Sequence, residues 1–270
     1  MPYCHVNTAE IYYEDYGEGQ PILMIHGFSP DHRLMSGCME PIFKEREGYR
    51  RIYIDLPGMG QSKNYERIDT TDDMLEAVLA FIDKTLPQAS FLIAGESYGG
   101  YLARGIIAKR RAQVAGAAFI CPMIIPRFED RTVPHHTILQ KDDAFLSSLS
   151  EEEAEDFASM GVVLNESTWN RYRKEILSGC RIADQRFLEK IKQHYGFTFE
   201  LDGHEFDRPS VFLLGRQDAT VGYRDAYGIL ERFPRATFAV LDLAGHNLQI
   251  EQPQLFHALI NEWLDRVERF

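Results

Sequence analysis

The sequence is poor in cysteine and carries no cysteine motif. Its four cysteines lie far apart along 270 residues and form no C-x-x-C pair, which argues against a dense disulfide framework and a zinc knuckle. Such isolated cysteines are typical of reduced thiols and favour a cytoplasmic location. The sequence also has no apolar stretch as long as a membrane span, and no charged N-terminal segment followed by an apolar run. We therefore expect neither a membrane anchor nor a signal peptide.

Positive charge is scarce as well. Lysine and arginine number 29 against 41 aspartates and glutamates, which gives a formal net charge of −12. An acidic surface repels phosphate backbones and anionic lipids, so neither nucleic acid nor a membrane is a predicted partner. A hydrophobic content of 44% is ordinary for a globular protein. The length suits one large α/β domain or a core with an inserted subdomain.

Short apolar runs alternate with helical patterns over the first 120 residues. The runs show little polar alternation, as expected for strands covered on both faces; they occupy residues 21–25, 51–54, 91–94 and 114–120. Similar runs return at 209–214 and 237–241, and an amphipathic helix begins at Pro253. This alternation predicts an α/β fold with a mostly parallel central sheet and helices on both faces.

The interval 126–206 breaks the alternation. It contains no buried-strand run, whereas Ser150 and Glu153 form a capping-box pattern and two later stretches have helical spacing. We predict a core domain of residues 1–125 and 207–270, with 126–206 inserted as a helical lid or cap. A separate helical domain is the alternative, and it is disfavoured because the strand pattern resumes directly afterwards.

The run 91–94 leads into Gly95-Glu96-Ser97-Tyr98-Gly99, a G-x-S-x-G pattern. This pattern is typical of a nucleophile elbow, in which the serine occupies a strained turn between a buried strand and a helix. The two glycines are expected because side chains at these positions would collide with the neighbouring strand and helix. The alternative is a glycine- and serine-rich loop without chemistry.

Two further candidates also follow predicted strands. Asp218 comes after the run 209–214 and His246 after the run 237–241, so both are expected at the sheet edge that carries Ser97. A serine hydroxyl needs a base, histidine has a suitable pKa for that task, and an aspartate can fix the histidine tautomer. The chain order Ser, Asp, His is that of α/β-hydrolases.

Together these patterns resemble the α/β-hydrolase family, in its lid-bearing, esterase-like branch, over nearly the whole chain. The resemblance rests on five short motifs in the family's order: His26-Gly27, Asp55-x-x-Gly58-x-Gly60-x-Ser62, Gly95-x-Ser97-x-Gly99, Gly215-x-x-Asp218 and Gly245-His246. It implies the α/β-hydrolase fold, a small-molecule ester or lactone substrate, and neither a metal nor an organic cofactor.

The resemblance also implies roles for individual residues. Ser97 would be the nucleophile, His246 the base and Asp218 the acid of a catalytic triad. The oxyanion hole would be formed by the backbone N–H groups of Phe28 and Tyr98.

Several other residues are further candidates for the site or its surroundings. Glu129 or Asp130 is a second-choice triad acid, His26 is expected to brace the oxyanion loop, and Glu96 is expected to be exposed or packed against the lid. The pair His135-His136 has no partner at metal-ligand spacing. Four large side chains are candidates for the substrate pocket, with simple core packing as the alternative: Met123, Phe128, Phe145 and Trp169.

Within the family, Ser97 argues against epoxide hydrolases and haloalkane dehalogenases, which carry an aspartate nucleophile. Carbon–carbon hydrolases carry tryptophan where this chain has Asn247, and proline iminopeptidases differ at Glu96 and Tyr98. The resemblance thus implies hydrolysis of a small or medium carboxylic ester or lactone through an acyl-enzyme. Carbon–carbon hydrolysis and aminopeptidase activity are alternatives, as is a slow or non-catalytic ligand-binding signalling protein on the same fold.

Overall fold

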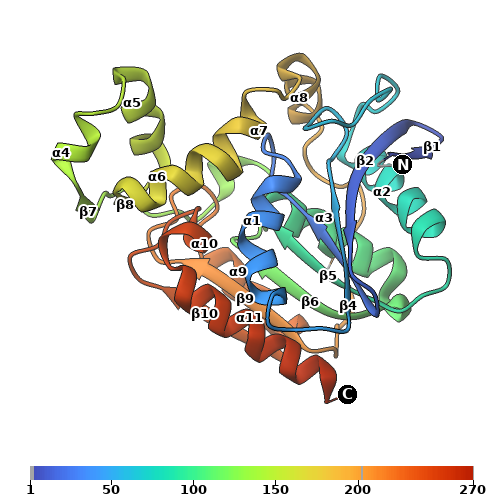
Figure 1. The fold of residues 1–270 in the computed structure, drawn as a ribbon. Helices are drawn as coiled ribbons and strands as arrows, with labels where there is room; N and C mark the ends of the chain where they lie inside the picture. The colour runs from blue at the N-terminus through green and yellow to red at the C-terminus, as the bar shows by residue number, and fades with distance from the viewer. Residues whose placement is uncertain (1–2, 202, 270) are drawn as a thin grey trace.

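An eight-stranded sheet forms the centre of the computed structural model, which describes residues 3–201 and 203–269 (Figure 1). The strand order is β1-β2-β4-β3-β5-β6-β9-β10. The strand bounds are β1 Tyr3–Val6, β2 Ala9–Tyr16, β3 Gln20–Ile25, β4 Tyr49–Ile54, β5 Phe91–Glu96, β6 Val114–Ile120, β9 Ser210–Gly215 and β10 Ala236–Leu241.

The sheet is parallel from β4 to β10, whereas β2 pairs in antiparallel fashion with both of its neighbours, β1 and β4. Strand β3 pairs with β4 on one side and with β5 on the other, so the chain reverses its direction of travel across the sheet at this point. Such a switch point opens a crevice at the carboxyl ends of the strands. The predicted mostly parallel sheet is confirmed.

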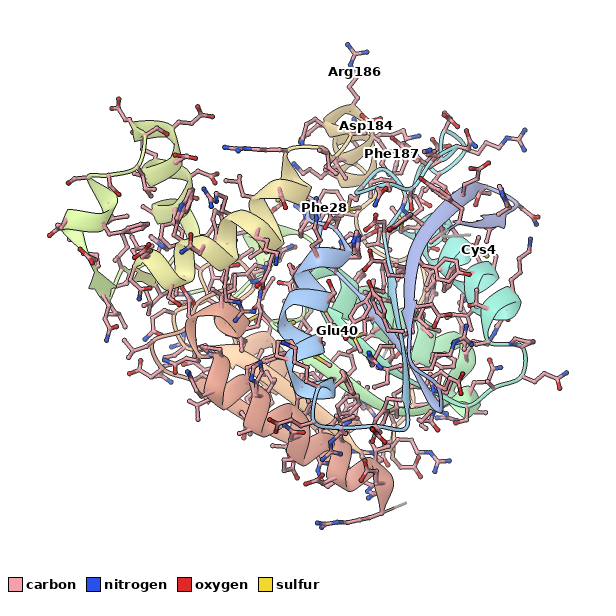
Figure 2. All side chains as sticks on the ribbon, viewed as in Figure 1. Cys4, Phe28, Glu40, Asp184, Arg186 and Phe187 are labelled. Carbon is pink, nitrogen blue, oxygen red and sulfur yellow. The ribbon has the colours of Figure 1, made fainter. Side chains whose placement is uncertain are left out.

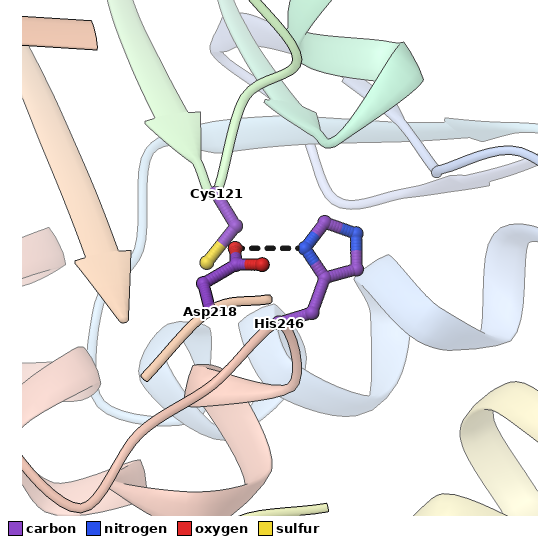
Figure 3. Close-up of side chains that lie close together, drawn as sticks. All are labelled: Cys121, Asp218 and His246. Atoms are coloured by element: carbon purple, nitrogen blue, oxygen red, sulfur yellow. Dashed lines mark hydrogen bonds and ion pairs between the residues drawn. The ribbon is translucent and has the colours of Figure 1, made fainter. Parts of the chain in front are cut away.

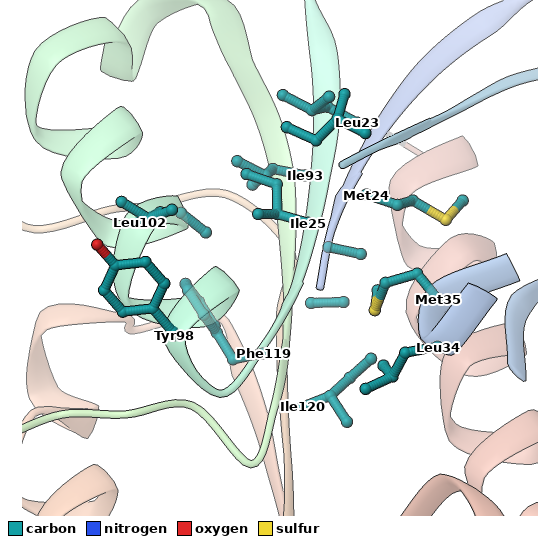
Figure 4. Close-up of a cluster of buried hydrophobic side chains, with 14 of the residues drawn as sticks. Leu23, Met24, Ile25, Leu34, Met35, Ile93, Tyr98, Leu102, Phe119 and Ile120 are labelled. Carbon is teal, nitrogen blue, oxygen red and sulfur yellow. The ribbon is translucent and has the colours of Figure 1, made fainter. Parts of the chain in front are cut away.

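Helices cover both faces of the sheet, as predicted. Helices α1 and α11 pack on one face, and α2 and α3 pack on the other. Figure 4 shows the sheet between Leu34 and Met35 of α1 on one side and Tyr98 and Leu102 of α3 on the other. The bounds are α1 His32–Phe43, α2 Thr71–Thr85, α3 Tyr98–Arg110, α9 Arg224–Gly228, α10 Leu248–Glu251 and α11 Pro253–Glu268.

The central strands explain why the sheet is stable. Every residue of β5 and of β9 is buried, because a parallel strand with helices above and below has no face left for solvent. Fully burying each large apolar side chain contributes about 1.5–3 kcal/mol relative to exposure. Strand β5 continues past the apolar run 91–94 through Gly95 and Glu96, so it places a carboxyl group in the buried layer.

The 126–206 segment lies between β6 and β9, and most of its regular structure is helical. Its helices are α4 Asp143–Leu146, α5 Glu151–Met160, α6 Glu166–Tyr172, α7 Ser178–Cys180 and α8 Gln185–Lys192, with a π-helical turn at Arg173–Leu177. The capping box of Ser150 and Glu153 opens α5. Two short strands, β7 Gln140–Lys141 and β8 Val163–Leu164, were not predicted because two residues make no recognisable run.

Parts of this segment differ in how closely they contact the core. Helices α4 and α5 project away from the sheet in Figure 1. Helix α8 is docked instead: Figure 2 shows Arg186 pointing into solvent, whereas Phe187 is buried. The Phe187 ring lies on Gly58, where a Cβ would collide with it, and its centroid is 4.7 Å from that of Tyr65. Among the described residues, no helix is both long and apolar enough to cross a membrane.

Candidate active site

Ser97 occupies a strained turn between β5 and α3. Its φ of 50° and ψ of −114° are unusual for a residue with a side chain. The turn is tight enough that a Cβ on Gly95 would collide with the carbonyl oxygen of Gly99, and one on Gly99 with that of Ile25. Both flanking glycines therefore have the steric role that the sequence pattern predicts.

Three side chains meet in a chain of hydrogen bonds at the carboxyl edge of the sheet. The Oγ of Ser97 lies 3.0 Å from Nε2 of His246, and Nδ1 of His246 lies 2.9 Å from Oδ2 of Asp218. Figure 3 shows the bond between His246 and Asp218, with Cys121 beside it. Asp218 is fully buried, and Ser97 and His246 are 9% and 8% exposed. The structure thus brings together the three residues that the sequence analysis selected.

Backbone groups hold Asp218 as an anion. Its other oxygen, Oδ1, accepts hydrogen bonds from the N–H groups of Thr220 at 2.8 Å and Val221 at 3.0 Å. Burial acts to raise the pKa of Asp218, but the charge of His246 and the hydrogen bonds from His246, Val221 and Thr220 keep the pKa below its ordinary value. A carboxylate in this position fixes the Nδ1–H tautomer of His246 and stabilises an imidazolium.

The loop that carries His246 is tied to the 126–206 segment by Glu251. One oxygen of this buried carboxylate accepts the N–H of Gly245 at 2.6 Å. The other accepts the N–H groups of Val162 at 2.6 Å and Val163 at 3.3 Å. No sequence pattern singles out Glu251, because its only local signal is an acidic side chain shortly after the histidine motif.

Glu96 lies elsewhere than the sequence analysis expected. It is only 3% exposed, and its Oε1 lies 3.3 Å from Nε2 of His246. Burial raises the pKa of Glu96; His246 acts in the opposite direction, Asp218 adds to the rise, and a backbone hydrogen bond from Gly27 opposes it. The sequence does carry a signal for the burial of Glu96. The buried strand extends up to Ser97, so the side chain of residue 96 is enclosed.

The loop after β3 is braced by His26. Its Nδ1 is 2.7 Å from the carbonyl oxygen of Gly27, and its Nε2 accepts the N–H of Leu56 at 2.9 Å. This bridge holds the loop that carries Phe28 beside the elbow. Tyr98 begins α3, so its N–H has no partner within the helix. The rings of Phe28 and Tyr98 pack edge to face, with centroids 5.2 Å apart.

A cavity of about 80 Å³ opens beside Ser97. The core supplies Gly27, Phe28, Pro30, Leu34, Glu96, Ser97, His246 and Asn247, and the 126–206 segment supplies Met160, Ile176 and Cys180. Apart from Glu96, Ser97, His246 and Asn247, this lining is apolar or backbone. The cavity is therefore suited to a small, largely apolar group next to the serine hydroxyl.

The four side chains proposed for the pocket lie outside the lining of this cavity. Met123 is buried and contacts Arg131, whereas Phe128 is 58% exposed in a separate surface cleft. Phe145 is partly buried against the core cluster. Trp169 packs against Phe157 and Tyr172 within the 126–206 segment, because residues three apart on a helix share a face.

The remaining candidates are engaged elsewhere. Glu129 is exposed and pairs with Arg127 at 2.6 Å, so it does not take the place of Asp218 beside the histidine. His136 contacts the carbonyl oxygen of Gly161. Among the described residues, two groups of side chains lie close enough together to hold a metal ion. They are Cys121 with Asp218 and His246, and Asp31 with His32 and Asp55.

Hydrogen bonds already occupy both groups. In the second group, His32 Nδ1 is 2.8 Å from Asp55, and Asp31 caps α1 and pairs with Arg33. In the first, His246 and Asp218 bond each other and the Cys121 thiol points to the carbonyl oxygen of Gly245. Burial raises the pKa of Cys121, which disfavours the thiolate that a metal would need. These contacts are explained without a metal.

Comparison with known proteins agrees with this architecture. A crystal structure of an alpha/beta superfamily hydrolase from Oenococcus oeni PSU-1 matches with a TM-score of 0.92 and 30% identity, covering 99% of this chain and 100% of that one. An AB hydrolase superfamily protein of Bacillus subtilis, YisY, is 28% identical, covering 96% of this chain and 98% of its own length.

A pimeloyl-[acyl-carrier protein] methyl ester esterase of Shewanella woodyi is 23% identical, covering 96% of this chain and 99% of its own. The family model of the alpha/beta hydrolase fold matches residues 20–253. That match spans most of the chain, including β3, the elbow, Asp218 and His246. The chain therefore belongs to the α/β-hydrolase fold family.

Proposed function

We propose that this protein is a serine hydrolase that cleaves a carboxylic ester or lactone with a small acyl group, through an acyl-enzyme. The observation that carries the proposal is the continuous set of hydrogen bonds from Ser97 Oγ through His246 to Asp218. An unactivated serine hydroxyl is a weak nucleophile, and this arrangement supplies the base that it needs.

In the proposed reaction, His246 Nε2 takes the proton of Ser97 while Oγ attacks the carbonyl carbon. The imidazolium then gives that proton to the leaving alcohol oxygen as the carbon–oxygen bond breaks. Water repeats the sequence on the acyl-enzyme, with His246 again taking and returning a proton, and the acid is released. Asp218 stays ionised throughout and stabilises the imidazolium.

The negative charge on the carbonyl oxygen needs donors. We assign these to the backbone N–H groups of Phe28 and Tyr98, because Phe28 borders the cavity and the Tyr98 N–H is free of helical bonding. The loss of one such donor typically costs roughly 3–4 kcal/mol of transition-state stabilisation. The N-terminal end of α3 favours a nearby anion as well.

The size of the cavity supports a small acyl group. A volume of about 80 Å³ with a largely apolar lining suits a short acyl chain rather than a long one. We propose that the 126–206 segment acts as a lid that sets this limit, because it supplies Met160, Ile176 and Cys180 to the wall. The esterase named among the relatives is consistent with an ester substrate.

The test is hydrolysis of p-nitrophenyl esters of increasing acyl length. We expect a burst of p-nitrophenol with the acetate, followed by steady turnover, and loss of both in Ser97→Ala. The control is Ser148→Ala, which removes an exposed hydroxyl far along the chain and should behave as wild type. Equal turnover by Ser97→Ala would contradict the proposal, and absence of wild-type turnover with tight retention of a ligand would favour a binding role.

A further inference from the structure

Two side-chain oxygens face the same nitrogen of His246. Nε2 lies 3.0 Å from Ser97 Oγ and 3.3 Å from Glu96 Oε1. The ring's other nitrogen is engaged by Asp218 at 2.9 Å. His246 is thus flanked by a buried carboxyl group at each nitrogen, although a serine base requires only the one at Nδ1.

The contact between Glu96 and His246 requires a proton between the two groups. When Nδ1 carries the proton donated to Asp218, the neutral ring has a lone pair at Nε2. An ionised Glu96 would present another lone pair to it at 3.3 Å, and two buried acceptors without a proton between them repel. The contact is favourable only when one proton lies on Glu96 or on Nε2.

We propose that Glu96 and His246 share one proton in the resting site, and that this proton must leave to solvent before His246 can accept the proton of Ser97. The inference rests on the proposed function. Glu96 acts through His246 and is a positioning residue: it sets the pH above which the base is available. No other bond changes in this step, because the proton passes from the pair to water.

The surroundings of Glu96 favour this shared state. Its Oε2 lies so close to Gly27 that a Cβ at residue 27 would collide with it, and the Gly27 backbone also bonds the carboxyl group. Burial raises the pKa of Glu96, which favours retention of a proton. Burial alone would lower the pKa of His246, but Asp218 and then Glu96 raise it above its ordinary value.

Other ionisable groups near the pair act less directly. Arg131 opposes a positive charge on His246, and Asp218 favours one. Burial raises the pKa of the neighbouring thiols and phenol, so these groups stay neutral near pH 7; they are Cys38, Cys121, Cys180 and Tyr195. Glu96 is therefore the second carboxyl group in contact with His246, and it titrates together with the histidine.

The first measurement is the pH dependence of kcat/KM for p-nitrophenyl acetate, in wild type and in Glu96→Gln. We expect wild-type activity to rise with pH through an apparent pKa above 6.5, the ordinary value for histidine. The glutamine variant cannot ionise and stabilises the imidazolium less, so its apparent pKa should fall by about one pH unit or more. An unchanged apparent pKa overturns the proposal. Glu129→Gln removes an exposed carboxylate and should keep the wild-type profile.

The second measurement needs no turnover. The ring nitrogens of His246 are followed by NMR in ¹⁵N-histidine-labelled Ser97→Ala, with and without Glu96→Gln, and are assigned by their loss in His246→Gln. We expect the imidazolium to persist to higher pH when Glu96 is present. If His246 titrates identically with and without Glu96, the shared proton is overturned, even when the esters are hydrolysed. If the two titrations differ but no ester is turned over, the shared proton is supported and only the proposed function is refuted.

Discussion

The carboxyl edge of the sheet and the 126–206 segment contribute to the same cavity in different ways. In the proposed reaction the edge supplies the nucleophile, the base and the acid, because Ser97, Asp218 and His246 each follow a parallel strand. The segment supplies only apolar wall and a thiol at Met160, Ile176 and Cys180. Under the proposed function, strand register therefore positions the reacting groups, whereas side chains that the sheet does not position set the limit on substrate size.

A single buried carboxylate joins the two regions. Glu251 accepts backbone N–H groups from Gly245, next to His246, and from Val162 and Val163 in the segment. The comparison therefore predicts large kinetic effects for changes at the edge, mixed effects at the junction, and effects on selectivity or local stability within the segment.

The largest effect is expected at the edge itself. Asp218→Asn should lower kcat by about 10⁴-fold, because the amide favours the wrong tautomer of His246 and cannot stabilise the imidazolium. Steady-state kinetics with p-nitrophenyl acetate measure this. Asp130→Asn, at the alternative acid, is the matched control and should lower kcat by less than about twofold. A reversed order of the two variants would refute the assignment of Asp218.

At the junction, Glu251→Ala leaves three backbone N–H groups without their acceptor. Each unsatisfied buried group costs about 1–3 kcal/mol, and we expect the free energy of unfolding to fall by about 3 kcal/mol with a lower kcat. Urea denaturation measures the stability. Glu231→Ala, at an exposed glutamate, is the control. If both variants lose equal stability, the bridge does not join the two regions.

Within the segment, Ile176→Ala should change selectivity more than chemistry. Removing three carbons from the cavity wall makes room for a longer acyl chain, so the ratio of kcat/KM for butyrate over acetate should rise about tenfold. Ile182→Ala makes the same change at an isoleucine that is 54% exposed and should leave the ratio as it is. An unchanged ratio of kcat/KM for butyrate over acetate in Ile176→Ala would show that the segment does not select the substrate.

The smallest effect is expected far from the cavity. Ser150→Ala removes the capping box of α5 and should destabilise that helix by about 1 kcal/mol, with kcat and KM unchanged. Hydrogen exchange of the α5 amides reports the local loss. Ser148→Ala removes a hydroxyl that bonds the carbonyl of Phe145 instead, and α5 should then exchange as in wild type. A fall in kcat in Ser150→Ala would mean that the two regions are coupled more widely.

The sequence was sufficient for the sheet and the hydrogen-bonded trio because both depend on local patterns. Buried parallel strands appear in the sequence as continuous apolar runs. A residue that follows such a run lies at the carboxyl edge of the sheet, independently of the packing of distant segments. Register then aligns the ends: Leu241 pairs with Gly215, and Glu96 with Ile120. Ser97, Asp218 and His246 could be found by this route.

The rest depends on partners that local patterns do not specify. Glu96 meets His246 and the Gly27 backbone, and Glu251 meets the N–H groups of Val162 and Gly245; no local pattern specifies these contacts. Trp169 was a pocket candidate by its size, yet helical spacing directs it to Phe157 and Tyr172. The packing of the helices decides which apolar side chains line a cavity. In the 126–206 segment, that packing depends on short irregular connections between the helices.

The central claim is that Ser97 is an activated nucleophile, and covalent labelling tests it most directly. The intact protein is treated with a fluorophosphonate, digested, and mapped by mass spectrometry in wild type, Ser97→Ala and His246→Gln. We predict one adduct on the peptide that contains Ser97, its absence in Ser97→Ala, and much slower formation in His246→Gln. Undiminished labelling of Ser97→Ala, or labelling of wild type at another serine, would contradict the account.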